Sequence, residues 1–222
     1  MRVVIFFLYV ALVTFAGYLD SEFSTQLMSI FFLISSAYFL YIRKDELKFK
    51  VQINKPFTWV ILLAVTSALM GILLTHKEEF TNYYSTFNNM NLSHILLVCL
   101  VYPLVEEIVF RLYWLKDLSN KLSNVKSIVI VSFGFSIYHL FSGIPLLYAF
   151  LYSVIISWLY LKFNKLYLCI IFHVLYNTSV VLIYTTIQNI EFTNQIRIVG
   201  LILAATIIVL SLKQLYVNPK SL

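Results

Sequence analysis

Long apolar runs, separated by short segments that carry most of the lysines and arginines, constrain this chain more than any other feature. A transmembrane helix needs about 20 mostly apolar residues. Runs of roughly this kind lie at 3–19, 25–42, 57–75, 94–114, 127–142, 144–161, 167–187 and 196–212. Only 12% of the 222 residues are charged, against about 25% in soluble domains. The sequence therefore predicts an all-α fold: a polytopic membrane helix bundle of about eight transmembrane helices, with residues 1–222 forming one integral membrane domain.

The basic residues predict the orientation of these helices. Lysine and arginine concentrate on the cytoplasmic side of short loops, and every second connection here is basic. The basic connections are 43–56, 115–126 and 162–166, followed by a basic tail after 212. This alternation predicts both termini in the cytoplasm. The first run is interpreted as a retained helix, because Phe15-Ala16-Gly17-Tyr18 is a poor signal-peptide cleavage pattern.

Net charge and cysteine content exclude several other classes. The formal charge of +6 comes from residues placed between apolar runs, which argues against a nucleic-acid partner. Both cysteines, Cys99 and Cys169, fall inside apolar runs, so neither a disulfide framework nor a cysteine-ligated metal is expected.

A small set of polar residues interrupts the apolar runs. A charge at mid-bilayer costs from about 2.5 to above 10 kcal/mol, and function is the default hypothesis for such residues. They are Glu106, Glu107 and Arg111 in the run 94–114, His139 in the run 127–142, and His173 with Asn177 in the run 167–187.

Helical spacing sorts these residues into roles. Glu107 and Arg111 are four apart and share one helix face, which favours a structural ion pair. Glu106 lies about 100° around the helix from Glu107, outside that pair, and suits a general base. His173 and Asn177 are also four apart and face the same way.

Depth in the bilayer supports a single site. At about 1.5 Å per residue, Glu106, His139, His173 and Asn177 lie roughly 12, 18, 9 and 15 Å from the cytoplasmic ends of their runs. All four fall in the middle part of a hydrocarbon core about 30 Å thick. The sequence therefore predicts one active site inside the bilayer, reached by water from the cytoplasmic half.

Three motifs carry a resemblance to a known family. Glu106-Glu107-Ile108-Val109-Phe110-Arg111 reads EExxxR, Phe135-Ser136-Ile137-Tyr138-His139 reads FxxxH, and His173-Val174-Leu175-Tyr176-Asn177 reads HxxxN. In this order on successive membrane helices, they resemble the CAAX protease and bacteriocin-processing family, also called the Abi family, which includes the CAAX prenyl endopeptidase. The resemblance covers about 94–187. The chain departs from the family at Leu112, where glycine is common.

The resemblance implies an endopeptidase with its active site in the membrane. It assigns activation of the attacking water to Glu106 and His139, and stabilisation of the oxyanion to His173 and Asn177. Glu107, Arg111 and Phe135 would have supporting roles. Zinc held by Glu106, His139 and His173 is the alternative chemistry; without an HExxH motif, a metal-free, cofactor-free mechanism is favoured.

The predicted function is hydrolysis of a peptide bond in a membrane-associated peptide or lipidated protein. The alternative is a non-catalytic immunity or scaffold protein of the same family, although all motif groups are intact. A transporter is less favoured, because the polar residues cluster in neighbouring helices without a counterpart in the first half. Abundant Lys, Asn, Ile, Phe and Tyr indicate an AT-rich genome, and hence a bacterial cytoplasmic membrane. The sequence leaves the oligomeric state open.

Overall fold

The computed structural model describes residues 2–18, 34–44, 55–74, 92–140, 144–187 and 193–217, and their regular structure is entirely helical. This confirms the all-α prediction. Among the described residues, three helices are long and apolar enough to cross a membrane: Leu146–Phe163, Leu166–Ile183 and Asn194–Val217. Shorter apolar helices occupy Phe57–Leu73 and Asn124–Tyr138. These helices fit a helical membrane protein, and the number of about eight spans stays a prediction.

Most helices begin and end within a few residues of the predicted runs. They are α1 (Arg2–Tyr18), α3 (Lys55–Leu74), α9 (Leu146–Phe163), α10 (Leu166–Ile187) and α11 (Asn194–Val217). Residues 34–42 are also helical and match the second half of the run 25–42, whose first half lies outside the described residues.

The run 94–114 has a more complex structure than predicted. Five consecutive helical segments cover 92–119: α5 (Leu92–Leu96), η3 (Leu97–Val101), α6 (Tyr102–Glu107), η4 (Ile108–Leu115) and α7 (Lys116–Ser119). The η segments are π-helices, in which hydrogen bonds join residues five apart. α6, which ends on the double glutamate, therefore lies between two π-helical segments, a feature common at functional sites.

The helix α8 (Asn124–Tyr138) is shorter than the predicted run 127–142 at its C-terminal end. Ser123 caps its N-terminus by accepting a hydrogen bond from the backbone N–H of Lys126. His139 is the C-cap, with φ −89° and ψ 7°. The prediction that His139 lies inside a membrane helix was therefore inaccurate, because the chain leaves helical geometry at this residue.

The chain forms two compact units. The first unit contains Met1–Phe49 and Leu104–Cys169, and the second contains Lys50–Pro103 and Ile170–Leu222. The prediction of a single membrane domain over 1–222 stays a prediction.

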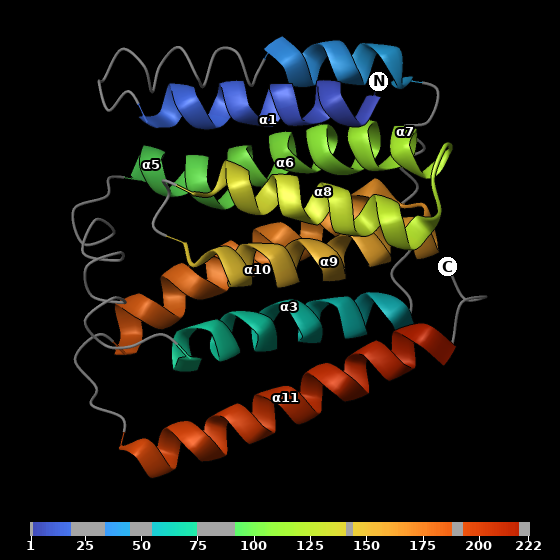
Figure 1. Ribbon diagram of the computed structural model, residues 1–222. Helices are drawn as coiled ribbons and strands as arrows, with labels where there is room; N and C mark the ends of the chain where they lie inside the picture. The colour runs from blue at the N-terminus through green and yellow to red at the C-terminus, as the bar shows by residue number, and fades with distance from the viewer. Residues whose placement is uncertain are drawn as a thin grey trace. The chain divides into compact units, whose positions relative to one another are not determined.

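The first unit is built around aromatic side chains. α8 packs against both α9 and α1, and α1 runs beside the helix at 34–42 (Figure 1). Phe6 of α1 is fully buried, with ring centroids 5.1 Å from Trp114 and 6.2 Å from Phe110. Phe39 stacks on Tyr113 at 3.8 Å, with the rings 9° from parallel. This packing holds η4, which carries Arg111, against its neighbours.

The second unit contains a long pair of helices, α3 and α11, which run side by side (Figure 1). Near one end of the pair, Arg197 of α11 donates two hydrogen bonds, of 3.3 and 3.0 Å, to the Leu73 carbonyl. The last carbonyls of a helix have no partner within the helix, so this arginine satisfies one of them at the end of α3. Much of α11 is exposed and apolar, including Ile202 and Leu203, as a helix in contact with lipid requires.

Candidate active site

Two of the predicted motifs come together in the first unit, with most of their polar groups buried. Glu107 and Arg111 have no exposed surface, Glu106 is 6% exposed and His139 is 9% exposed. Glu106 and Glu107 end α6, and Arg111 follows in η4. Phe135 lies in the last turn of α8, and His139 caps that helix. The turn at the end of α8 thus brings the second motif to the helix that carries the first.

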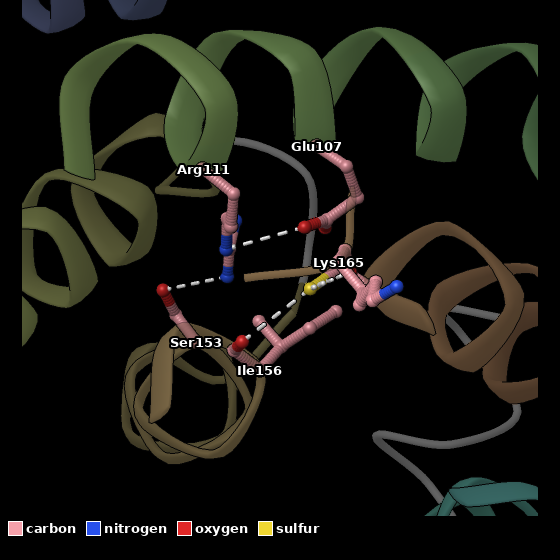
Figure 2. A network of polar contacts seen from close by, with 6 residues as sticks. Glu107, Arg111, Ser153, Ile156 and Lys165 are labelled. Carbon is pink, nitrogen blue, oxygen red and sulfur yellow. Dashed lines mark hydrogen bonds and ion pairs between the residues drawn. The ribbon is translucent and has the colours of Figure 1, made fainter. Parts of the chain in front are cut away.

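Arg111 connects Glu107 to α9. Its Nε lies 3.2 Å from Glu107 Oε2, and its Nη2 donates a 2.9 Å hydrogen bond to Ser153 Oγ. Figure 2 shows the guanidinium between the carboxylate of its own helix and the serine of α9. This confirms the predicted ion pair and adds Ser153, which is also fully buried. A buried charge is tolerated when it is paired and hydrogen-bonded.

The same network reaches the start of α10. The thiol of Cys169 lies 3.7 Å from the Ile156 carbonyl and donates a weak hydrogen bond to it (Figure 2). Both Cys99 and Cys169 are buried and free. Cys169 therefore acts as a small packing residue that attaches α10 to α9 within the first unit.

Phe135 contacts both Arg111 of the ion pair and His139. The Arg111 guanidinium lies over the Phe135 ring, 4.8 Å from its centroid, which is within cation–π range. The imidazole of His139 lies 4.4 Å from the same ring. Phe135 is 2% exposed and contacts both groups. Its supporting role stays a prediction.

The backbone determines which nitrogen of His139 carries the proton. Nδ1 of His139 lies 2.9 Å from the Phe135 carbonyl oxygen. A carbonyl only accepts hydrogen bonds, so Nδ1 is the donor in this contact. In the neutral imidazole, Nε2 then carries the lone pair. His139 is thus prepared to act through Nε2 as a base or hydrogen-bond acceptor.

Glu106 is held separately from the Glu107–Arg111 pair. Its carboxyl forms a side-chain hydrogen bond with Tyr138, the last residue of α8. The charges of Glu107 and Arg111 both act on it, with opposite signs. Arg111 forms its ion pair with Glu107, and its charge also acts on Glu106.

The third motif lies in the second unit, on α10. His173 is 4% exposed, and Asn177 follows one helical turn later. The Asn177 amide donates a 2.9 Å hydrogen bond to the Val98 carbonyl in η3. In a π-helix this carbonyl would accept from residue 103, which is Pro103 and has no N–H. Asn177 therefore satisfies a carbonyl that proline leaves unbonded.

Sequence reasoning missed two residues of the site. Ser153 lies in an apolar run, and its spacing from other polar residues did not indicate a site residue. Its residue type gave no signal either, because serine occurs widely in membrane helices. Tyr138 stands inside the FxxxH motif, at a position that the motif leaves unspecified. Its proximity to His139 in the sequence was the only available signal.

Residues 88–179 match the family described as Type II CAAX prenyl endopeptidase Rce1-like. This segment, less than half of the chain, is similar to that family. The resemblance predicted from the three motifs is confirmed, and all three lie within the Rce1-like segment. A search of the curated proteins and a search of the solved structures find no match. The family points to a protease that works in a membrane environment.

Zinc is the alternative chemistry for this site. Catalytic zinc takes three protein ligands, whereas no group of three or more His, Cys, Asp or Glu side chains is placed as a metal site in the described part of the chain. In the first unit Glu106 and His139 are two candidates. The zinc alternative, with Glu106, His139 and His173 as ligands, stays a prediction.

Proposed function

We propose that this protein is an intramembrane endopeptidase, which hydrolyses a peptide bond in a membrane-associated peptide or lipidated protein without a metal or other cofactor. The proposal is carried by one observation, supported by the Rce1-like match. A buried carboxyl next to the ion pair, Glu106, and a histidine with a defined tautomer, His139, share one aromatic neighbour, Tyr138.

In this proposal the attacking nucleophile is a water molecule. Glu106 accepts a proton from the water as it attacks the scissile carbonyl, and Nε2 of His139 orients the water or shares the proton. When the tetrahedral intermediate collapses, the C–N bond breaks and Glu106 gives this proton to the leaving amine. Arg111 and Glu107 keep the helix of Glu106 in place, together with Phe135. Water reaches the site from the cytoplasmic half of the membrane, as the sequence predicted.

The third motif supplies the oxyanion stabilisation in this proposal. A tetrahedral intermediate carries a negative oxygen, which fixed donors stabilise strongly in a site that excludes bulk water. His173 and Asn177 are the proposed donors. An asparagine amide has two N–H groups, so the hydrogen bond from Asn177 to Val98 occupies one of them and the second can serve the oxyanion.

The substrate class follows from the site and the membrane. A site inside the bilayer receives chains that already lie at the membrane, such as a hydrophobic leader peptide or a lipid-modified protein. We further propose that the protein works in a bacterial cytoplasmic membrane with both termini in the cytoplasm. Under this proposal cleavage takes place near the membrane-proximal end of the substrate.

Cleavage of a mixed library of membrane peptides by detergent-purified protein tests the proposal. Wild type is expected to cleave at defined bonds, and Glu106→Ala, His139→Ala and His173→Ala are expected to lose activity by at least about a hundredfold. Leu147→Ala, on an exposed position of α9, is the matched control and should retain activity. A chelator should have no effect.

Two outcomes would change the proposal. Loss of activity on chelation, with recovery on adding zinc, would establish a metalloenzyme. A folded wild type that cleaves nothing, while the alanine variants still support a cellular phenotype, would establish a binding, scaffold or immunity role instead.

A further inference from the structure

Tyr138 occupies an unusual position in the first unit. It is the last residue of α8, directly before His139, whose φ and ψ leave the helical range. Because the helix ends here, the two side chains are not constrained to the 100° separation of helical neighbours. Tyr138 is half-buried and faces the helix that carries the first motif.

The contacts of Tyr138 join both groups that the proposed reaction uses. Its side chain hydrogen-bonds the carboxyl of Glu106. Its ring lies 4.7 Å from the imidazole of His139 at 87°, an edge-to-face contact. The ring also has its centroid 5.8 Å from that of Phe110 and 6.4 Å from that of Phe135. A ring held on several sides keeps its hydroxyl in a defined place.

The direction of the hydrogen bond follows from the chemistry of the two groups. An ionised carboxylate only accepts hydrogen bonds, whereas a phenol has an O–H to donate. When Glu106 is ionised, as its proposed role as a base requires, the Tyr138 hydroxyl donates to one of its oxygens. This leaves further lone pairs on the carboxylate, which has about four acceptor positions.

We propose that Tyr138 is a positioning residue of the active site, which orients the Glu106 carboxylate and the His139 imidazole toward the same water molecule. The inference rests on the proposed endopeptidase function and adds a residue to it. Tyr138 acts through Glu106 and His139 and takes no part in bond making. A catalytic group held in the productive geometry by a neighbour with a fixed rotamer reacts faster than one free to rotate.

Tyr138→Phe tests the inference, because it keeps the packed ring and removes only the hydroxyl. The expected result is a fall in kcat of about tenfold to a hundredfold with KM nearly unchanged, since the lost contact orients the base and does not bind substrate. Tyr113→Phe is the matched control. It removes a phenol hydroxyl from a ring that stacks on Phe39 elsewhere in the first unit, and it should leave kcat unchanged.

A second measurement decides the inference without any proteolysis. Infrared spectra of protein carrying ¹³C-labelled glutamate are compared for wild type and Tyr138→Phe, and the Glu106 band is identified by its loss in Glu106→Gln. The Glu106 band should shift in Tyr138→Phe and stay in place in Tyr113→Phe. An unshifted band shows that the hydroxyl does not contact the carboxyl, and overturns the inference.

The outcomes separate the two proposals. An inactive wild type contradicts the endopeptidase function, whatever the infrared spectra show. An active wild type with unchanged kcat in Tyr138→Phe contradicts the positioning role and leaves the endopeptidase function standing. A rise in KM alone also contradicts it, because that pattern indicates a substrate contact.

Discussion

Arg111 carries a full charge in the interior of the first unit, and its guanidinium meets three neighbours at once. Nε faces Glu107, Nη2 donates to Ser153, and the planar face covers the Phe135 ring. A lysine could not make these contacts together, because its ammonium is a point charge without a fork or a flat face. These three contacts explain why the first motif ends in arginine.

Replacing Glu107 tests how much the buried Arg111 guanidinium depends on its counter-charge. Glu107→Ala leaves a buried guanidinium without its counter-charge, and we expect a loss of about 3–5 kcal/mol in the free energy of unfolding. Adding Arg111→Met should recover part of that loss, because the unpaired charge is then gone. Unfolding in mixed detergent micelles measures both variants, and strictly additive losses would contradict the coupling.

Ser153→Ala should destabilise the protein by about 1.5–3 kcal/mol, because Arg111 loses a hydrogen bond to a charged group. Ser157, one turn further along α9, provides a matched control. It is also fully buried, and its hydroxyl has no hydrogen-bond partner among the described residues. Ser157→Ala should therefore leave the free energy of unfolding nearly unchanged. Equal losses in the two variants would show that the Arg111 contact contributes nothing specific.

At the scale of elements, the stretch from 92 to 119 is the unusual feature. The double glutamate ends a short α-helix that lies between two π-helical segments. At the first segment, the change of helix type coincides with Pro103, which cannot donate to the preceding turn. Asn177 of α10 supplies the missing donor to Val98. A residue of the third motif thus supports the helix that leads to the first.

Replacing Asn177 removes its hydrogen bond to the Val98 carbonyl. Asn177→Leu leaves the Val98 carbonyl without its donor, and we expect a loss of about 1–3 kcal/mol and faster amide hydrogen exchange in η3. In a Pro103→Ala background the new N–H can bond the same carbonyl, so the same replacement should have a smaller effect. Equal effects in the two backgrounds would contradict this role of Asn177.

The packing of α1 on α8 depends on Gly134. A methyl group at this position would overlap the Phe6 ring, so Gly134→Ala should cost about 1–3 kcal/mol through overpacking. Adding Phe6→Leu should restore part of the loss by making room. Gly71→Ala in α3 is the control, since its methyl group would meet Tyr176 at 3.4 Å, an ordinary contact distance. Thermal unfolding in detergent compares the variants, and a stable Gly134→Ala would show that α1 can shift at no cost.

At the scale of the whole molecule, the helices and the basic segments together predict a membrane topology. In the part of the chain that the structure describes, three helices have the length and hydropathy of membrane spans. The distribution of lysine and arginine predicts an orientation for about eight. The two compact units interleave along the sequence, so each needs segments from both halves of the chain. We therefore expect the protein to insert as one chain and not to divide into separable halves.

Reporter fusions test this topology. Fluorescent-protein fusions within 43–56 and after 212 should fluoresce, because both positions are predicted to face the cytoplasm. Alkaline phosphatase should be active when fused within 76–93, which is predicted to face the other side. Phosphatase activity at the basic segments would reverse the orientation, and it would place access to the active site on the opposite face.

The sequence alone determined the features that depend on local composition and spacing. Apolar runs predict helices because lipid leaves every backbone group to be satisfied within the helix, and a spacing of four residues places Glu107 and Arg111 on one face. Ser153, Tyr138 and the tautomer of His139 were decided only by the tertiary structure. Each depends on which side chain or carbonyl of another turn or helix lies within hydrogen-bond distance, and helical periodicity does not specify that.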